Sequence, residues 1–461
     1  MKYISTRGGI APVGFGESVM MGLARDGGLL LPTTIPDVSK QLAKWRKLSY
    51  PELAYEIMSL FTDLPPGDLR TLIDKSYSTF DSKEITPVVQ VGGIHVLELF
   101  HGPTLAFKDL ALQLLGNLFE YVLKESGQHL NILAATSGDT GSAAIQGVRG
   151  KEQIRIFVMH PHGRTSDIQE RQMTSVLDDN VFNIAIEGTF DDCQGIMKAL
   201  FNDLNFKDRY SLGSVNSINW ARVLAQIVYY FYAAFCVMDK TGKQSVRFAV
   251  PTGNFGDIFA GYMAAKMGLP IARLILATNE NDILSRFFNT GVYSLGKVHA
   301  TVSPSMDIQV ASNFERYLFC RLGQDAAKLK KLMQTFAKEG KISVELDKGK
   351  SVDPLFIAGA GNTATTLSTI KEFYDKHGYL LDPHSAVGVH VGMQHIDAGE
   401  PLICLATAHP SKFADAIKNA TGHDLAHHPL IDALKNLPTR CEVLPASAPT
   451  VRKYIESHAS A

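Results

Sequence analysis

One lysine stands where a short apolar segment turns into an amphipathic one. The segment ELFHGPTLAFKDLALQ contains Lys108, which falls in the first turn of the helix that the apolar spacing predicts. Most lysines lie on the surface, and a helix N-terminus carries partial positive charge that disfavours a cation. Lys108 is therefore either a surface residue or an amine with a chemical task, because screening from water beside Phe107 would favour its neutral, nucleophilic form.

A glycine-rich loop, VPTGNFGDIFAG, lies between a predicted strand and a predicted helix. Gly253 and Gly256 bracket it, and Asn254 and Phe255 lie between them. Glycines let several backbone N–H groups point at one spot, and the helix N-terminus adds unpaired donors, so the loop fits a phosphate group. Asp257 would repel a phosphate, and we expect it to cap the helix or to orient the loop. The alternative is an ordinary tight turn.

A second loop, ATSGDTGSAA, offers small hydroxyl and backbone donors where another helix begins. Its residues are Thr136, Ser137, Gly138, Asp139, Thr140 and Gly141. Such a cluster suits a carboxylate, although Ser, Asp and Thr are also the usual N-caps of helices. Both roles can hold together.

A third polar patch, SVNSINWAR, precedes a long apolar helix. Arg222 lies in the first turn, where the helix dipole favours acids. An anion held between Asn216, Ser217 and Arg222 would relieve that mismatch, while simple helix capping is the alternative. The pair Arg164 and Ser166 has the same ambiguity.

A lysine near a phosphate loop indicates pyridoxal phosphate, whose aldehyde forms an imine with a lysine amine.

These loops need a scaffold of alternating strands and helices. We predict strands at 95–100, 130–136, 154–160, 181–188, 246–253, 273–279 and 402–410, with helices between them and a long helix over 217–239. This alternation predicts an α/β fold with parallel sheets, in which ligands bind at the carboxyl ends of strands. Residues 1 to about 85 read as a mostly helical opening segment.

Composition narrows the class of protein. The 461 residues carry 45 basic and 46 acidic side chains, so nothing indicates a nucleic-acid partner. The longest apolar run, 227–238, is too short to span a bilayer, and the N-terminus lacks an apolar signal sequence. Five cysteines without a CxxC pair indicate neither a metal site nor a disulfide framework. We expect a cytoplasmic protein that binds no nucleic acid, membrane or metal.

The chain resembles the threonine synthase family, in its longer bacterial and fungal class. The resemblance is carried by MKYISTRGG, LFHGPTLAFKD, TSGDTGSAA, NSINWARVLAQIVYYF, PTGNFGD and TAHPSKF. It implies the tryptophan-synthase-β-like fold, with two parallel-sheet α/β domains and a mostly helical N-terminal domain. The implied ranges are 1–85 for the N-terminal domain, 86–103 with 216–461 for a large cofactor domain, and 104–215 for a smaller domain carrying the substrate carboxylate loop.

The resemblance also implies an activity and residue roles. The family converts O-phospho-L-homoserine and water to L-threonine and phosphate with pyridoxal phosphate. Lys108 would be the Schiff-base lysine and move protons, and Thr407 would meet the pyridine nitrogen. The implied cofactor loop comprises Gly253, Asn254, Phe255, Gly256 and Asp257. The implied substrate residues are Thr136, Ser137 and Thr140 for the carboxylate and Asn216, Ser217 and Arg222 for the phosphate. Asp139 stands where shorter relatives have Asn beside the cofactor's 3-hydroxyl.

Two other functions fit the same residues less well. A threonine or serine dehydratase, or a phospholyase of the same fold, is one alternative; a dehydratase needs no site for a substrate phosphate, so NSINWAR would then only cap a helix. A non-catalytic, cofactor-binding regulatory protein is the other, and Lys108 with an intact GNFG loop argues against it. The sequence leaves open whether the protein is a monomer or a homodimer.

We expect Lys108 to carry the cofactor. Borohydride reduction of the purified protein followed by peptide mapping should place the pyridoxyl label on Lys108, and Lys108→Ala should abolish both the colour near 410–420 nm (about the range of an enzyme-bound Schiff base) and turnover. Label on Lys266 or Lys412 would contradict the assignment.

Overall fold

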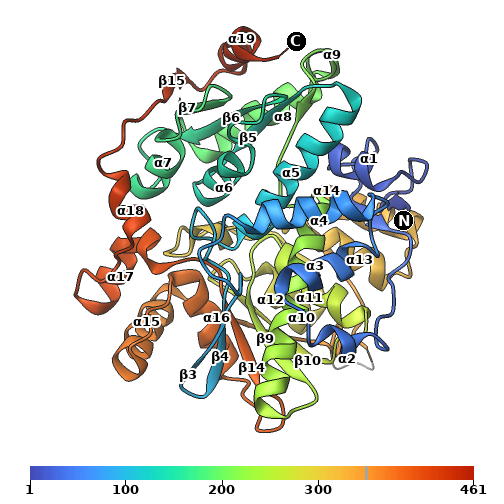
Figure 1. Cartoon of the computed structure of the whole chain (residues 1–461), viewed down its shortest axis with the longest axis vertical. Helices are drawn as coiled ribbons and strands as arrows, with labels where there is room; N and C mark the ends of the chain where they lie inside the picture. The colour runs from blue at the N-terminus through green and yellow to red at the C-terminus, as the bar shows by residue number, and fades with distance from the viewer. Residues whose placement is uncertain (348–350, 461) are drawn as a thin grey trace.

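Two twisted sheets organise the computed structural model, which describes residues 1–347 and 351–460 (Figure 1). Within these residues, the larger sheet has six strands in the order β13-β10-β9-β14-β4-β3. They are β3 (Val88–Val91), β4 (Ile94–Glu98), β9 (Val246–Pro251), β10 (Ile271–Thr278), β13 (Phe356–Ala360) and β14 (Leu402–Ala406). Neighbours are parallel except β3 and β4. Parallel strands need helical crossovers, which then cover both faces of the sheet.

The smaller sheet is parallel throughout, with the order β15-β7-β6-β5-β8 among the described residues. Its strands are β5 (Leu130–Ala135), β6 (Ile154–Pro161), β7 (Val181–Glu187), β8 (Leu212–Gly213) and β15 (Glu442–Pro445). The predicted α/β fold with parallel sheets is confirmed. The strand β3 was not predicted; it forms an antiparallel hairpin with β4 at the edge of the larger sheet.

Helices surround both sheets (Figure 1). The N-terminal segment holds α1 (Phe15–Met21), α2 (Leu42–Trp45), α3 (Tyr50–Met58) and α4 (Pro66–Tyr77), with an antiparallel pair of strands, β1 (Tyr3–Ser5) and β2 (Leu30–Pro32). The other elements are α5 (Lys108–Ser126), α6 (Asp139–Val148), α7 (Asp167–Thr174), α8 (Phe190–Asn202), α9 (Leu204–Arg209), α10 (Trp220–Thr241), α11 (Gly256–Lys266), α12 (Ile283–Thr290), β11 (Val292–Ser294), η1 (Pro304–Met306), α13 (Phe314–Arg321), α14 (Ala326–Glu339), β12 (Lys341–Ser343), α15 (Thr363–His377), α16 (Pro383–Met393), η2 (Pro410–Phe413), α17 (Ala414–Thr421), α18 (Pro429–Leu434) and α19 (Ala448–His458).

The C-terminal segment departs from the predicted domain ranges. The range 216–461 was assigned to the large domain, yet β15 pairs with β7 of the smaller sheet. Val451 and Ile455 of α19 are fully buried in the hydrophobic cluster on that sheet. After β14 of the larger sheet the chain therefore runs back to the smaller sheet before it ends, as the red C-terminal segment of Figure 1 shows. The other predicted limits remain predictions.

The apolar helix α10 lies in the core. Among the described residues it is the one helix long and apolar enough to cross a membrane, but 89% of its most apolar window is buried inside the protein. A core helix of a soluble protein meets the same criteria, and the burial on all sides explains why this helix is apolar all round.

Helices α5 and α6 touch through their backbones. A Cβ atom on Gly116 of α5 would lie 2.0 Å from the carbonyl oxygen of Gly147 in α6. A Cβ atom on Gly147 would lie 2.4 Å from the carbonyl oxygen of Leu112. Only glycine permits this approach, and it aligns the two helix N-termini that carry Lys108 and Asp139.

We expect Gly116→Ala to destabilise the fold, because the added methyl group must displace the backbone of α6. Overpacking of this kind costs about 1–3 kcal/mol, which should lower the thermal unfolding midpoint measured by circular dichroism at a fixed scan rate. Gly195→Ala is the matched control, since a Cβ atom at Gly195 in α8 meets nothing within 4 Å. Equal midpoints for the two variants would contradict the backbone contact.

Candidate active site

Three residues that were predicted as functional follow neighbouring strands of the larger sheet. The sheet order β9-β14-β4 sets the carboxyl ends of these strands side by side. Gly253 follows β9, Thr407 follows β14, and the turn to Lys108 follows β4. The backbone N–H of Phe107 donates to the carbonyl oxygen of Thr407 at 2.8 Å, which fixes the start of α5 against the end of β14.

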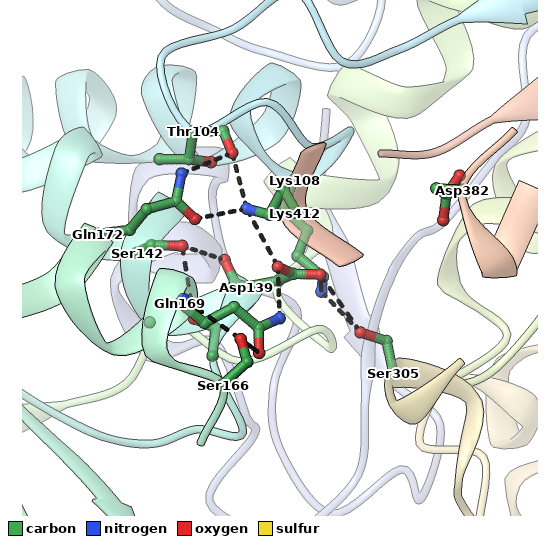
Figure 2. A network of polar contacts seen from close by, with 12 residues as sticks. Thr104, Lys108, Asp139, Ser142, Ser166, Gln169, Gln172, Ser305, Asp382 and Lys412 are labelled. Atoms are coloured by element: carbon green, nitrogen blue, oxygen red, sulfur yellow. Dashed lines mark hydrogen bonds and ion pairs between the residues drawn. The ribbon is translucent and has the colours of Figure 1, made fainter. Parts of the chain in front are cut away.

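Lys108 is buried rather than solvated, with 8% of its surface exposed. Its Nζ lies 3.3 Å from the Ser305 hydroxyl and 3.4 Å from Oδ2 of Asp139 (Figure 2). Burial lowers the pKa of Lys108, the Asp139 charge opposes that shift, and the positive charges of Lys412 and Arg222 add to it. The direction of this shift agrees with the expectation of an amine whose charged form is disfavoured, and the role of Lys108 stays a prediction.

Asp139 lies between two lysines. Its Oδ1 accepts from Gln169 Nε2 at 2.9 Å and is 3.1 Å from Lys412 Nζ, while Oδ2 faces Lys108 (Figure 2). Burial alone would raise the pKa of Asp139, but Lys412 and Lys108 together hold that pKa well below its usual range. Asp139 is therefore a carboxylate at neutral pH, and it starts α6 beside Lys108.

The glycine-rich loop is built against Ser305. A Cβ atom on Gly253 would lie 2.7 Å from the carbonyl oxygen of Ser305, so this position requires glycine. Phe255 adopts φ 65° and is buried against the rings of Phe288 and Phe314, which anchors the loop. Asn254 is exposed and accepts from the Ser312 hydroxyl at 3.1 Å. The loop presents backbone N–H groups at the start of α11, as an anion-binding turn does.

Asp257 does not cap its helix. The N-cap position is Phe255, with no side-chain cap, and the Asp257 carboxylate accepts instead from the hydroxyls of Tyr229 at 2.6 Å and Tyr230 at 2.8 Å. Burial raises the pKa of Asp257 to about 6. The expected capping role is wrong, because two tyrosines of α10 supply donors that the sequence does not place there. Asp257 fastens α11 to α10 and thereby orients the loop.

Arg222 is a buried cation that forms no ion pair with the residues the structure describes. It is 4% exposed, its Nη1 donates to the Val215 carbonyl at 3.4 Å, and its Nε has no partner among the described residues. Burial lowers the pKa of Arg222 to about 10. An unpaired buried guanidinium is costly unless an anion binds there. Asn219, not Asn216 or Ser217, caps α10.

The neighbours of Arg222 reach the glycine-rich loop. Ser217 Oγ is 2.8 Å from Ser312 Oγ, and Ser312 bonds Asn254. Asn216 Oδ1 accepts from the Ile218 N–H at 3.3 Å. The SVNSINWAR patch and the glycine-rich loop therefore lie side by side and share one serine.

The ATSGDTGSAA loop divides into a fixed and an accessible part. The Thr136 hydroxyl accepts from the N–H groups of Gly138 at 2.9 Å and Gly141 at 3.0 Å, so it shapes the loop. Ser137 is exposed and Thr140 is half-buried. Their hydroxyls and the N-terminus of α6 are the donors left for a ligand.

Arg164 and Ser166 do not form an anion patch. Arg164 is exposed, and Ser166 caps α7 by accepting from the Gln169 N–H at 3.3 Å. Ser166 contacts the site only indirectly: its hydroxyl donates to Oε1 of Gln169, and Gln169 in turn donates to Asp139.

Several residues at the site were not predicted as functional. Lys412 is 1% exposed and bonded to Asp139, and Ser305 contacts Lys108. The Ser305 N–H donates to His384 Nε2 at 3.2 Å, and His384 Nδ1 is 2.9 Å from Asp382. Lys412 belongs to TAHPSKF, a motif that carried the family resemblance, so a signal for it was present.

Comparison with known proteins agrees with this site. A family model described as "Threonine synthase N terminus" matches residues 2–77, "Pyridoxal-phosphate dependent enzyme" matches 80–355, and "Threonine synthase, C-terminal" matches 385–455. A threonine synthase of Methylobacillus glycogenes is 47% identical over 99% of this chain and 100% of that protein. One of Pseudomonas aeruginosa is 46% identical over 99% of this chain and 98% of that protein. A crystal structure of PLP-bound threonine synthase from Brucella melitensis has a TM-score of 0.95, 46% identity and full coverage of both chains.

The fold and the buried lysine beside a glycine-lined anion loop define a pyridoxal-phosphate-dependent enzyme. Matches that span nearly the whole chain at these identities narrow the class. The chain belongs to the threonine synthase family.

We expect Gly253→Ala to weaken cofactor binding, because its methyl group must push away the Ser305 backbone and open the loop. The dissociation constant for pyridoxal phosphate, measured by absorbance titration of the cofactor-free protein, should rise at least about tenfold, equivalent to roughly 1.4 kcal/mol. Gly67→Ala, at a position with nothing within 4 Å, serves as the control. Unchanged binding of pyridoxal phosphate by Gly253→Ala would show that the cofactor phosphate does not bind at this loop.

Proposed function

We propose that this chain catalyses the threonine synthase reaction, the conversion of O-phospho-L-homoserine and water to L-threonine and phosphate. The observation that carries the proposal is Arg222, a buried guanidinium with an orphaned Nε next to the site of Lys108. A substrate phosphate would supply its missing counter-ion.

The residues present fit pyridoxal phosphate. Lys108 supplies a buried amine whose pKa is lowered, and the 253–256 loop supplies backbone donors that a side chain at Gly253 would obstruct. Thr407, at the end of β14, would meet the pyridine nitrogen with its hydroxyl, and Asp139 would lie near the ring on the Lys108 side. When bound, pyridoxal phosphate links covalently to an amine and holds the electron pair that remains when a neighbouring carbon loses its proton.

Lys108 would act as the base. Its amine would take the α-proton of the substrate, and the lowering of its pKa by burial favours the neutral form that this task needs. Ser305, 3.3 Å from Lys108 Nζ, would orient the amine. His384 accepts from the Ser305 backbone N–H and so steadies the loop that holds this serine.

Two anion sites would hold the substrate from both ends. Ser137, Thr140 and the N-terminus of α6 would bind the carboxylate, with Thr136 shaping their loop. Arg222, Asn216 and Ser217 would bind the phosphate. Held between these sites, the substrate presents its α- and β-carbons to Lys108.

The bond changes follow from this placement. A β-proton leaves after the α-proton, and the bond between the γ-carbon and the phosphate oxygen breaks as phosphate departs with that electron pair. Arg222 stabilises the charge on the leaving phosphate. A proton is then added to the γ-carbon, water adds its hydroxyl to the β-carbon and releases a proton, and a proton returns to the α-carbon, which yields threonine; the third proton leaves with the phosphate.

The alternatives are less well supported. A dehydratase has no use for a buried arginine without a counter-ion, and a regulatory protein has no use for an activated Lys108.

A cytoplasmic location is proposed in keeping with five free cysteines. A monomer and a homodimer are both compatible with the proposal.

We expect Arg222→Leu to lower kcat/KM for O-phosphohomoserine by about ten- to two-hundredfold, because a hydrogen bond to a charged group contributes roughly 1.5–3 kcal/mol. Part of the loss should appear in kcat, since phosphate is also the leaving group. Cofactor colour should persist. Steady-state assays of phosphate release measure both parameters.

The decisive comparison uses serine, whose slow deamination needs no phosphate contact. Arg222→Leu should leave that reaction within about twofold of the parent. Arg273→Leu, at an exposed arginine, is the matched control and should change neither reaction. Equal slowing of both substrates by Arg222→Leu would make the residue structural and remove the support for the proposed function.

A further inference from the structure

Two buried lysines share one carboxylate at the start of α6. Asp139 receives Lys108 on Oδ2 at 3.4 Å and Lys412 on Oδ1 at 3.1 Å (Figure 2). The other titratable groups that interact with these residues are Arg222 from α10, His384 from α16 and the buried Asp109 of α5, whose carboxyl feels the charge of Lys412. Positively charged side chains therefore outnumber carboxylates around Lys108. Burying Lys108, Lys412 and Arg222 together, each with its charge, would cost free energy.

The two lysines are held very differently. Lys412 Nζ donates hydrogen bonds to the Thr104 carbonyl at 2.7 Å and to Gln172 Oε1 at 2.8 Å, and it forms an ion pair with Asp139 Oδ1 at 3.1 Å. The ammonium group therefore has three close oxygen neighbours for its three N–H groups. Gln172 is itself fixed, because its Nε2 donates to the same Thr104 carbonyl at 3.1 Å. This cage is complete only for the charged form of Lys412.

Lys108 has the weaker set of contacts. Its Nζ has two partners, at 3.3 and 3.4 Å, both at the long end of the hydrogen-bond range. Of two ammonium groups competing for one carboxylate, the one with poorer contacts loses its proton more readily. Lys108 is that group, and its pKa is lowered in agreement with this order.

We propose that Lys412 is a positioning residue whose ammonium group holds the Asp139 carboxylate through Oδ1 and thereby favours the neutral, nucleophilic form of Lys108. The link to catalysis rests on the proposed function, in which Lys108 is the covalent lysine. The charge of Lys412 weakens the hold of Asp139 on a Lys108 proton, while Gln169 keeps that carboxylate in place.

The test is competitive labelling of the full chain, freed of cofactor, with isotopic acetic anhydride across a pH series. Mass spectrometry of the Lys108 peptide then gives the titration midpoint of that amine. Lys412→Met removes the cation, so Asp139 attracts the Lys108 proton unopposed and the ammonium form is favoured. The midpoint should rise by at least about one pH unit, a tenfold loss of neutral amine at a given pH below it.

The charge-retaining variant Lys412→Arg should keep the midpoint closer to that of the parent than Lys412→Met does. Lys371→Met, which removes an exposed lysine paired with Asp375 on α15, is the matched control and should cause no shift. An unchanged or lowered Lys108 midpoint in folded Lys412→Met would overturn the proposal.

A second variant keeps the proposal testable if Lys412→Met does not fold. Gln172→Glu is nearly isosteric and gives Lys412 a carboxylate of its own, which shields its charge from Lys108, while the hydrogen bond from Gln172 Nε2 to the Thr104 carbonyl is lost. The Lys108 midpoint should rise, by less than in Lys412→Met. No rise in this variant would also overturn the proposal.

Failure of this inference and failure of the proposed function are separable, because the labelling uses neither substrate nor turnover. A shifted midpoint without threonine formation would remove the proposed function and leave the role of Lys412 intact. Threonine formation with an unshifted Lys108 midpoint would support the proposed function and overturn the role of Lys412.

Discussion

The buried ion pair between Asp139 and its two lysines is the constraint on which the rest of the site depends. It joins the consecutive helices α5 and α6 to η2, which lies far from both in the sequence. The backbone contact of α5 and α6 at Gly116 and Gly147 holds the helix that carries Lys108 close to the helix that carries Asp139. The sheet order β9-β14-β4 brings η2 and the glycine-rich loop to the same edge of the larger sheet. The architecture can therefore be understood as the means of holding one carboxylate between two amines out of water.

This arrangement leaves the site with surplus positive charge. Lys108, Lys412 and Arg222 are buried, and Asp139 is the carboxylate that contacts the two lysines. Such a surplus is expensive in an empty protein and favourable once anions bind. A cofactor phosphate, a substrate phosphate and a substrate carboxylate would offset it, so the electrostatics favour a doubly anionic amino acid as substrate. Burial is the main reason why the pKa of Lys108 is lowered, and the charges of Lys412 and Arg222 add to that shift.

The sequence predicted those parts of the site that depend on local pattern. Lys108 and the glycine-rich loop each follow a strand and open a helix, and parallel sheets gather such turns at one edge. Lys412 was not predicted because its burial depends on Thr104 and Gln172, which are 308 and 240 residues away. The expected capping by Asp257 was wrong for a similar reason, since Tyr229 and Tyr230 compete for its carboxylate. The return of β15 to the smaller sheet likewise depends on long-range pairing that no local pattern records.

The central claim is that the two anion sites and the neutral amine of Lys108 together direct one reaction, and the products formed from O-phosphohomoserine test it most directly. The purified protein with pyridoxal phosphate should release one phosphate for each threonine formed, with both quantified in the same reaction by phosphate assay and amino-acid chromatography. Release of phosphate with 2-oxobutanoate in place of threonine, or no phosphate release at all, would contradict the account.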